Sequence, residues 1–171
     1  GRRHVAPLLP AFLDANRDVT ISLDLSDRLA DIVNEGIDVA IRIGQLDDSS
    51  LVGVKLASNQ RVVVASPAYL AARGTPRAPA DLASHDCLTF GNYGNQARGW
   101  LFTIDGRGVA LRVSGPMECN DGAVLHEWAL AGKGLAWRSM WEVRDDLAAG
   151  RLVTVLDEFA APDNAIYAVF P

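Results

Sequence analysis

The sequence of 171 residues is short of cysteine, and this scarcity limits the chemistry that it can carry. Its two cysteines, Cys87 and Cys119, lie far apart and lack the close spacing of metal ligands. We therefore expect two buried free thiols in a reducing compartment rather than a disulfide framework. The sequence predicts neither a metal site nor a bound cofactor.

Positive charge and long apolar runs are scarce as well. The formal net charge is −5, whereas a protein that holds nucleic acid phosphates presents a basic face. No apolar run reaches the roughly 20 residues that cross a membrane, and no signal peptide is recognisable. We expect a cytoplasmic chain that by itself binds neither DNA nor a membrane.

Motifs of common catalytic sites are also absent. The sequence contains no GxSxG nucleophile motif, no P-loop and no HExxH pair. Its three histidines are scattered along the chain. The glycine-rich stretch 91–99 does not follow the strand–helix context of a phosphate-binding loop. These absences favour a binding protein over an enzyme.

Apolar residues nevertheless make up 49% of the chain, and their most informative pattern lies at residues 21–44. Apolar and polar residues alternate over 21–25, as in a strand with one buried face. Ser26 or Asp27 can cap a following helix, and a second apolar run ends at Gly44. This strand–helix–strand unit predicts parallel strands in an α/β sheet, where ligands bind beyond the carboxyl ends of the strands.

The remaining elements follow from apolar runs separated by turn residues. Asp105-Gly106 indicates a hairpin, and Asn120 or Asp121 can cap a helix that stops near Gly132. Outside these, we expect a helix at the start of the chain, helices over 68–73 and 141–148, and strands over 61–65, 87–90, 100–104, 109–113, 135–137, 152–156 and 165–170.

Several stretches resemble the effector-binding domain of LysR-type transcriptional regulators, in the order and spacing of that family and over nearly the whole chain. They are LSDRLADIVNEGIDVAIRIGQLDDSSL, ASPAYLAARGTPRAPADLASHDCL, ECNDGAVLHEWALAGKGLAW, DDLAAGRLVTVL and AIYAVFP. The resemblance implies a type II periplasmic-binding-protein-like α/β fold with two lobes joined by two crossover segments. Lobe I would comprise 1–65 plus 164–171 and lobe II would comprise 66–163, with a ligand cleft between them.

The resemblance also implies a function. The chain would be the effector-sensing half of a regulator, and a small molecule, with an anion favoured, would shift the relative population of the lobes. The family's DNA-binding helix-turn-helix and a preceding strand are absent from this sequence, so we expect an incomplete protein. A solute-binding protein of a transporter, which shares the fold, is the alternative, and an enzyme built on the same lobes is a weaker one.

Four residues of lobe I are candidates for effector binding. Ser26 and Asp27 stand at the start of the predicted helix, where backbone N–H groups favour an anion, although both can equally serve as plain caps. Arg42 interrupts an apolar run, so it either faces the cleft or pairs with an acid such as Asp38 or Asp24. Gly44 permits close approach of a ligand, or it only makes the turn.

Three residues of lobe II complete the predicted site. Asn120 and Asp121 open its main helix, and the family position of that helix puts them on the cleft wall. Arg138 departs from the family, which usually has two aliphatic residues and then a proline where this chain has Trp137-Arg138-Ser139. An arginine there suits a carboxylate because its planar fork donates bidentate hydrogen bonds. The alternative is a surface arginine stacked on a tryptophan.

The first helix carries a broad apolar face that predicts a subunit interface. Its apolar positions follow helical spacing, and the family pairs subunits through this helix and the strand after it. We therefore expect a homodimer through the first helix and strand 20–25, with Val5, Leu8, Leu9, Phe12 and Leu23 at the interface.

Overall fold

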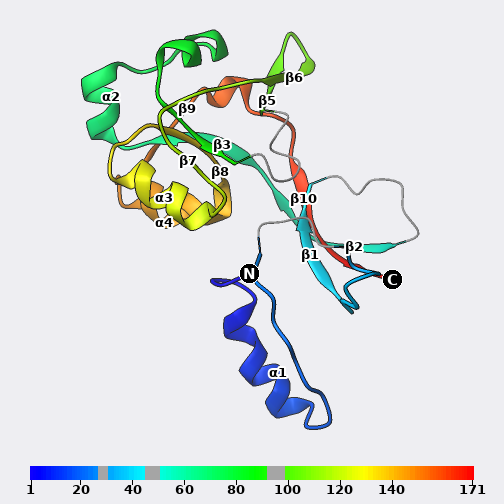
Figure 1. Ribbon diagram of the computed structural model, residues 1–171. Coiled ribbons are helices and arrows are strands. Elements are labelled where there is room, and N and C mark those ends of the chain that lie inside the picture. Colours follow the sequence, from blue (N-terminus) through cyan, green and yellow to red (C-terminus); the bar gives the residue numbers. More distant parts are fainter. Residues whose placement is uncertain (27–30, 45–50, 92–98) are drawn as a thin grey trace.

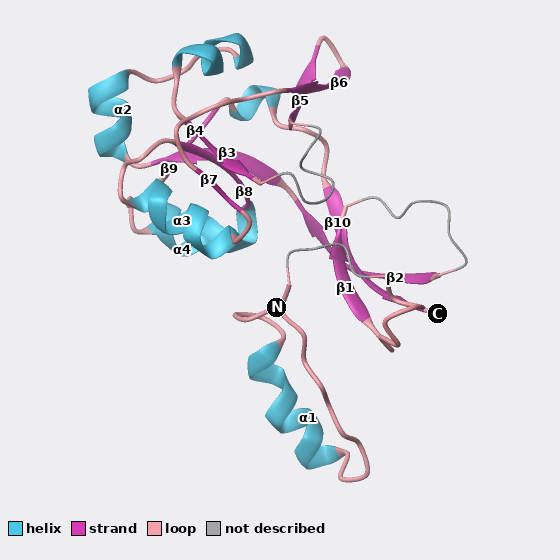
Figure 2. Ribbon diagram, in the orientation of Figure 1, coloured by secondary structure: helices cyan, strands magenta, loops and turns pink. Residues whose placement is uncertain are grey.

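The structure is a computed structural model, and it describes residues 1–26, 31–44, 51–91 and 99–171. Its strands form a three-stranded sheet, a five-stranded sheet and a two-stranded hairpin (Figure 1). Figure 2 shows the other helices gathered around the five-stranded sheet, whereas the first helix stands apart from both sheets. The molecule therefore has two differently constructed halves.

The three-stranded sheet has the order β1-β10-β2, with all pairs antiparallel. Its strands are β1 (Ala40–Ile43), β2 (Val52–Asn59) and β10 (Asn164–Phe170). Before it come a short 3-10 helix, η1 (Ala6–Leu8), and α1 (Leu9–Ala15). The expected first helix is thus confirmed, but none of its residues is buried.

The five-stranded sheet has the order β7-β4-β8-β3-β9 and mixes parallel with antiparallel pairs. Its strands are β3 (Arg61–Ala65), β4 (Cys87–Phe90), β7 (Glu118–Cys119), β8 (Leu135–Ser139) and β9 (Val153–Val155). Its helices are α2 (Pro67–Arg73), α3 (Gly122–Leu130) and α4 (Met140–Ala148), with 3-10 turns η2 (Pro79–Ser84) and η4 (Asp157–Phe159).

Side chains pack on both faces of this sheet, which explains the uninterrupted apolar run of β3. Val62 and Val64 face one core, which includes Leu125 of α3 and Val143 of α4. Val63 and Ala65 face a second core beneath α2, η2 and the hairpin of β5 (Trp100–Ile104) and β6 (Arg107–Leu111). The predicted hairpin is confirmed, with Asp105 and Gly106 both at positive φ in its turn.

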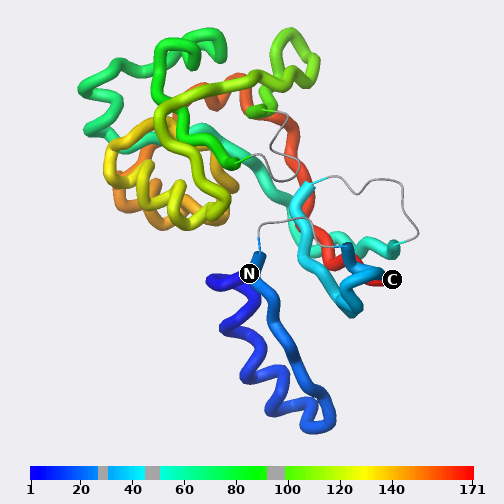
Figure 3. The backbone as a smooth tube through the Cα atoms, viewed as in Figure 1, coloured from blue at the N-terminus to red at the C-terminus, as the bar shows by residue number. Residues whose placement is uncertain are grey.

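Two segments connect the sheets, and they run side by side (Figure 3). One leads from β2 through Gln60 into β3, and the other returns from β9 through η4 into β10. The buried side chain of Asn59 donates a hydrogen bond of 2.7 Å to Asn164 and so links them. The predicted lobe limits stay a prediction, but the pairing of β3 with β8 and β9 favours a first boundary at Gln60 rather than after residue 65.

The predicted strand over residues 20–25 is wrong, because this segment is irregular and pairs with no strand of the described residues. Leu23 and Leu25 are 44% and 45% exposed. Alternation favours a strand only where a neighbouring strand supplies a hydrogen-bond ladder and a core covers the apolar face. Residues 27–30 of the predicted helix lie outside the described residues, and 32–36 form turns. The last run forms β1, but antiparallel to β10.

Candidate functional site

Among the predicted effector residues that the structure describes, Arg138 is the one that is buried, at 6% exposure. It stands near the carboxyl end of β8, opposite Val62 of β3, and its side chain is on the α3–α4 face of the sheet. Its Nη2 lies 2.9 Å from Oε2 of Glu142 in the first turn of α4. Its buried Nε has no hydrogen-bond partner among the described residues. A buried cation is therefore only partly satisfied here.

The first residue of α3 shapes the space around this guanidinium. A Cβ placed on Gly122 would lie only 2.7 Å from Nη2 of Arg138 and 3.2 Å from Nη1. The guanidinium thus lies against the backbone where α3 begins, and a side chain at position 122 would displace it. The structure brings β8, the start of α3 and the start of α4 together at one point.

The two polar residues that precede this glycine are exposed, and they differ in what they do. Asp121 is the N-cap of α3, since its Oδ1 accepts the backbone N–H groups of Ala123 at 2.7 Å and Val124 at 3.2 Å. Capping therefore accounts for Asp121, and its carboxylate would repel an anion. Asn120 lies beside the cap, and its predicted contact with an effector stays a prediction.

The candidates of the first half lie elsewhere. Ser26 is exposed in the irregular segment, and Asp27 lies outside the described residues. Arg42 is half-buried in β1, opposite Tyr167 of β10. Gly44 has a φ of +116° and donates its N–H to the carbonyl of Ala165 across 3.0 Å, so its backbone extends the contact of β1 with β10 by one hydrogen bond. Of the predicted site, the structure brings together Asn120, Asp121 and Arg138.

Aromatic contacts surround the junction of β8 and α4. The Arg61 guanidinium carbon lies 4.5 Å from the ring centre of Trp137, so Arg61 and not Arg138 makes the cation–π contact there. His4, from the start of the chain, meets Trp141 edge-on, with ring centres 4.7 Å apart. The N-terminal segment therefore reaches the half of the molecule that holds Arg138.

An open groove of about 610 Å³ lies on the other half of the molecule. Its lining is Ile32, Val33, Gly36, Ile37, Asp38, Val39, Phe170 and Pro171. None of these is a predicted effector residue, and the lining is mostly apolar. A groove of this composition offers an anion no cation, so we do not place the effector there.

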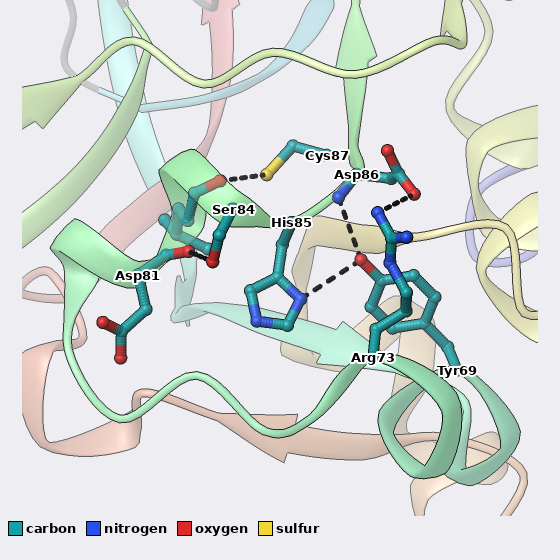
Figure 4. A network of polar contacts seen from close by, with 8 residues as sticks. Tyr69, Arg73, Asp81, Ser84, His85, Asp86 and Cys87 are labelled. Carbon is teal, nitrogen blue, oxygen red and sulfur yellow. Dashed lines mark hydrogen bonds and ion pairs between the residues drawn. The ribbon is translucent and has the colours of Figure 1, made fainter.

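A polar network in the five-stranded half could be mistaken for a catalytic arrangement (Figure 4). Tyr69 Oη lies 3.2 Å from Nδ1 of His85 and accepts the N–H of Asp86 at 2.9 Å, while Arg73 pairs with that aspartate at 3.0 Å. The nearby Ser84 hydroxyl donates to a backbone carbonyl in its own turn. Because the Ser84 hydroxyl is engaged in that turn, the network presents no activated nucleophile. Its contacts fasten α2 to the start of β4.

The thiols offer little chemistry either. Both cysteines are free, with Cys87 buried as expected and Cys119 only half-buried. Burial raises the pKa of the Cys87 thiol to about 12, so this thiol stays protonated at neutral pH. Within the described residues, no group of three His, Cys, Asp or Glu side chains is placed to hold a metal ion, and no helix is long and apolar enough to cross a membrane.

Sequence reasoning missed Glu142 and Gly122. The four-residue spacing of Arg138 and Glu142 is typical of a pair on one helix, but here it joins the end of a strand to the first turn of the next helix. Gly122 looks in sequence like an ordinary residue after a cap. Only the packing of α3 against β8 shows that the guanidinium needs its space.

Comparison with known proteins places the whole chain in one family. The family model for the LysR substrate binding domain matches residues 1–171. The regulator DmlR of Escherichia coli K12 is 39% identical over 170 residues, 99% of this chain and 55% of that protein. CrgA of Neisseria meningitidis serogroup C, also a transcriptional regulator, is 34% identical over 95% of this chain and 55% of its own length. The chain thus spans about half the length of these curated relatives.

Solved structures agree with this assignment. The regulatory domain of CrgA from Neisseria meningitidis has a TM-score of 0.81 and 32% identity, covering 98% of this chain and 81% of that one. The full-length virulence activator AphB of Vibrio cholerae has a TM-score of 0.82 and 26% identity, covering 99% of this chain and 57% of its own. The predicted fold class, a type II periplasmic-binding-protein-like α/β fold, is therefore confirmed.

Proposed function

We propose that this chain, which belongs to the LysR substrate binding domain family, is the part of a DNA-binding transcriptional regulator that senses a small anionic effector. Its curated relatives are named transcriptional regulators, which supports this function and not the transporter alternative. The regulator acts in the cytoplasm, where its DNA is, and this chain is no enzyme. DNA contact belongs to a part of the protein outside this chain.

The observation that carries the proposal of an anionic effector is the buried guanidinium of Arg138. A buried charge is costly unless hydrogen bonds and an opposite charge compensate it. Glu142 compensates Arg138 at one nitrogen, and the buried Nε lacks a partner among the described residues. A carboxylate that accepts from two guanidinium nitrogens would complete the compensation. Asn120, exposed just before α3, would contact the rest of the effector.

The contribution of the other half of the molecule is proposed on weaker grounds. Arg42 lies in β1 and Gly44 directly follows that strand, whereas Ser26 and Asp27 are kept from the sequence prediction alone, because a ligand held between two lobes needs contacts from both. A homodimer through α1 and residues 20–25 is supported by the exposure of Leu8 and Phe12, at 67% and 48%. Leu8 ends η1 and Phe12 lies in α1, which directly follows it, and exposed apolar side chains so close together are typical of an interface.

Substitution of Arg138 tests the effector site. Charge-assisted hydrogen bonds are worth about 1.5–3 kcal/mol, so Arg138→Ala should weaken binding of a carboxylate effector by roughly 10- to 150-fold. Calorimetric titration of a panel of small carboxylates into both proteins measures the change. Arg17→Ala is the matched control, because Arg17 forms an exposed ion pair with Asp14 at 3.2 Å. An affinity that Arg138→Ala leaves unchanged would remove Arg138 from the site.

A further inference from the structure

We infer that Glu142 is an internal competitor of the effector. In the ligand-free domain Glu142 pairs with Arg138, and the effector's carboxylate displaces it. The inference rests on the proposed function, since it takes Arg138 as an anion-binding residue. It assigns to Glu142 the setting of both the affinity of the site and its preference for ligands that bind two guanidinium nitrogens.

The first step is the asymmetry of the ion pair. The side chain of Arg138 is 7% exposed, whereas that of Glu142 is 27% exposed. The cation is therefore fixed in the protein interior and the anion lies at the edge, in partial contact with solvent. A ligand that arrives from solvent reaches the position of the glutamate carboxylate while the guanidinium stays where it is.

The second step is the incomplete use of the arginine. One oxygen of Glu142 accepts from Nη2 of Arg138 at 2.9 Å and from the backbone N–H of Ser139 at 3.3 Å. Nε of Arg138 is left buried without a partner among the described residues. A carboxylate that takes Nε and Nη2 together satisfies both donors, so it has an advantage over the glutamate that it replaces.

The third step connects this exchange to the rest of the domain. Glu142 lies in the first turn of α4, and its bond to Ser139 helps to start that helix. The same guanidinium lies against Gly122 at the start of α3. Release of the glutamate thus changes contacts at the starts of two helices, and these changes accompany effector binding.

NMR of the 171-residue chain tests the exchange with Glu142→Gln. Glutamine keeps an oxygen that can accept from Ser139 but removes the competing charge. Propionate is the probe and propionamide its neutral counterpart, with the Nε–H resonance of Arg138, identified by its loss in Arg138→Lys, as the signal. We expect propionate to bind Glu142→Gln about 10-fold more tightly than the wild type, which is the effect of one charge-assisted contact. Propionamide should show no such gain.

Asp14→Asn is the matched control, because it removes the same charge from an exposed ion pair elsewhere. Glu142→Asp is the second variant if the glutamine variant does not fold. Its shorter carboxylate reaches the guanidinium less well, so a gain of about 2- to 3-fold is expected. The inference is overturned if the folded variant binds propionate no better than the wild type, or if Asp14→Asn shows an equal gain. Loss of carboxylate binding in Arg138→Ala, with no gain in Glu142→Gln, would overturn this inference and leave the proposed function standing.

Discussion

The two sheets of this molecule contain similar apolar sequences but treat them differently. In the five-stranded sheet, four of the five residues of β3 are buried, and helices or turns pack on both faces. In the three-stranded sheet, seven of the eight residues of β2 are exposed, including Val52, Val54 and Leu56. The difference teaches that apolar patterning marks a surface to be covered, while the neighbouring elements decide whether it is covered.

The largest expected effect contrasts the two halves directly. Leu135 of β8 is completely buried in the core, whereas Val54 of β2 is 48% exposed. Leu135→Ala should cost about 2–5 kcal/mol of unfolding free energy, because it removes buried contacts and leaves a cavity. Val54→Ala should change it by less than about 0.5 kcal/mol. Urea unfolding at one protein concentration measures both. Equal losses would show that the two halves are covered alike.

A smaller loss is expected from the buried polar link between α3 and α4. Nε2 of His126 lies 2.7 Å from Oδ2 of Asp146, whose other oxygen accepts from Nε of Arg151 at 2.6 Å. Asp146→Asn should cost about 1–3 kcal/mol, because it leaves buried hydrogen-bonding groups poorly matched. Asp86→Asn is the control, because its ion pair with Arg73 is exposed. Equal melting temperatures of Asp146→Asn and Asp86→Asn would contradict this prediction.

The same aspartate predicts a pH dependence. Burial alone would raise the pKa of Asp146, but hydrogen bonds from Arg151 and His126 outweigh it and hold that pKa below the usual 3.8. Since the folded state then binds the proton less readily than the unfolded chain, the stabilisation is present above the unfolded pKa. It is lost as pH falls through the folded value. Stability measured from neutral pH down to about 3 should therefore fall more steeply for the wild type than for Asp146→Asn.

A substitution on the proposed dimer face should weaken self-association with little change in fold. Phe12 of α1 is 48% exposed on the proposed dimer face, and Leu101 of the β5–β6 hairpin is 39% exposed on the other half. Phe12→Glu should dissociate the dimer because it introduces a charge into an apolar interface. Leu101→Glu should leave the dimer intact. Sedimentation at tens of micromolar compares them, and a wild type that is strictly monomeric would refute the proposed dimer.

The last prediction is that this chain alone does not bind DNA measurably. The chain has a net charge of −5 and should show little or no affinity for promoter fragments. A gel-shift titration at low salt is the most sensitive measurement. A sequence-preferring shift that weakens as salt rises would mean that this chain itself holds DNA.

Predictions from sequence succeeded where local chemistry and burial agreed. The run over 61–65, the Asp105-Gly106 turn and the helix capped by Asp121 all formed as expected. Prediction failed over residues 20–25, where alternation alone did not produce a strand. It also passed over β2, although Val52, Val54 and Leu56 alternate with smaller or polar residues, because glycine and lysine interrupt the run.

The candidate site divides in the same way. Arg138 stood out from sequence because it departs from the family's usual aliphatic residue at the carboxyl end of a predicted strand, where a guanidinium suits a carboxylate. Its partner could not be inferred, since the choice of Glu142 depends on how β8 turns into α4. The need for glycine at position 122 is likewise invisible in sequence, because it arises from a guanidinium 16 residues further along the chain.

The sequence by itself thus determined the caps, the turns, the doubly buried strands and the family, because these depend on neighbouring residues and on patterns that the chain carries locally. The tertiary structure alone decided the change of strand partners at Gln60, before which β2 pairs with β10 and after which β3 pairs with β8 and β9. It also decided the burial of Arg138 and its contacts with the starts of α3 and α4. The physical reason is that these features depend on contacts between segments far apart in the chain. Their free energy exists only once both sides are in place.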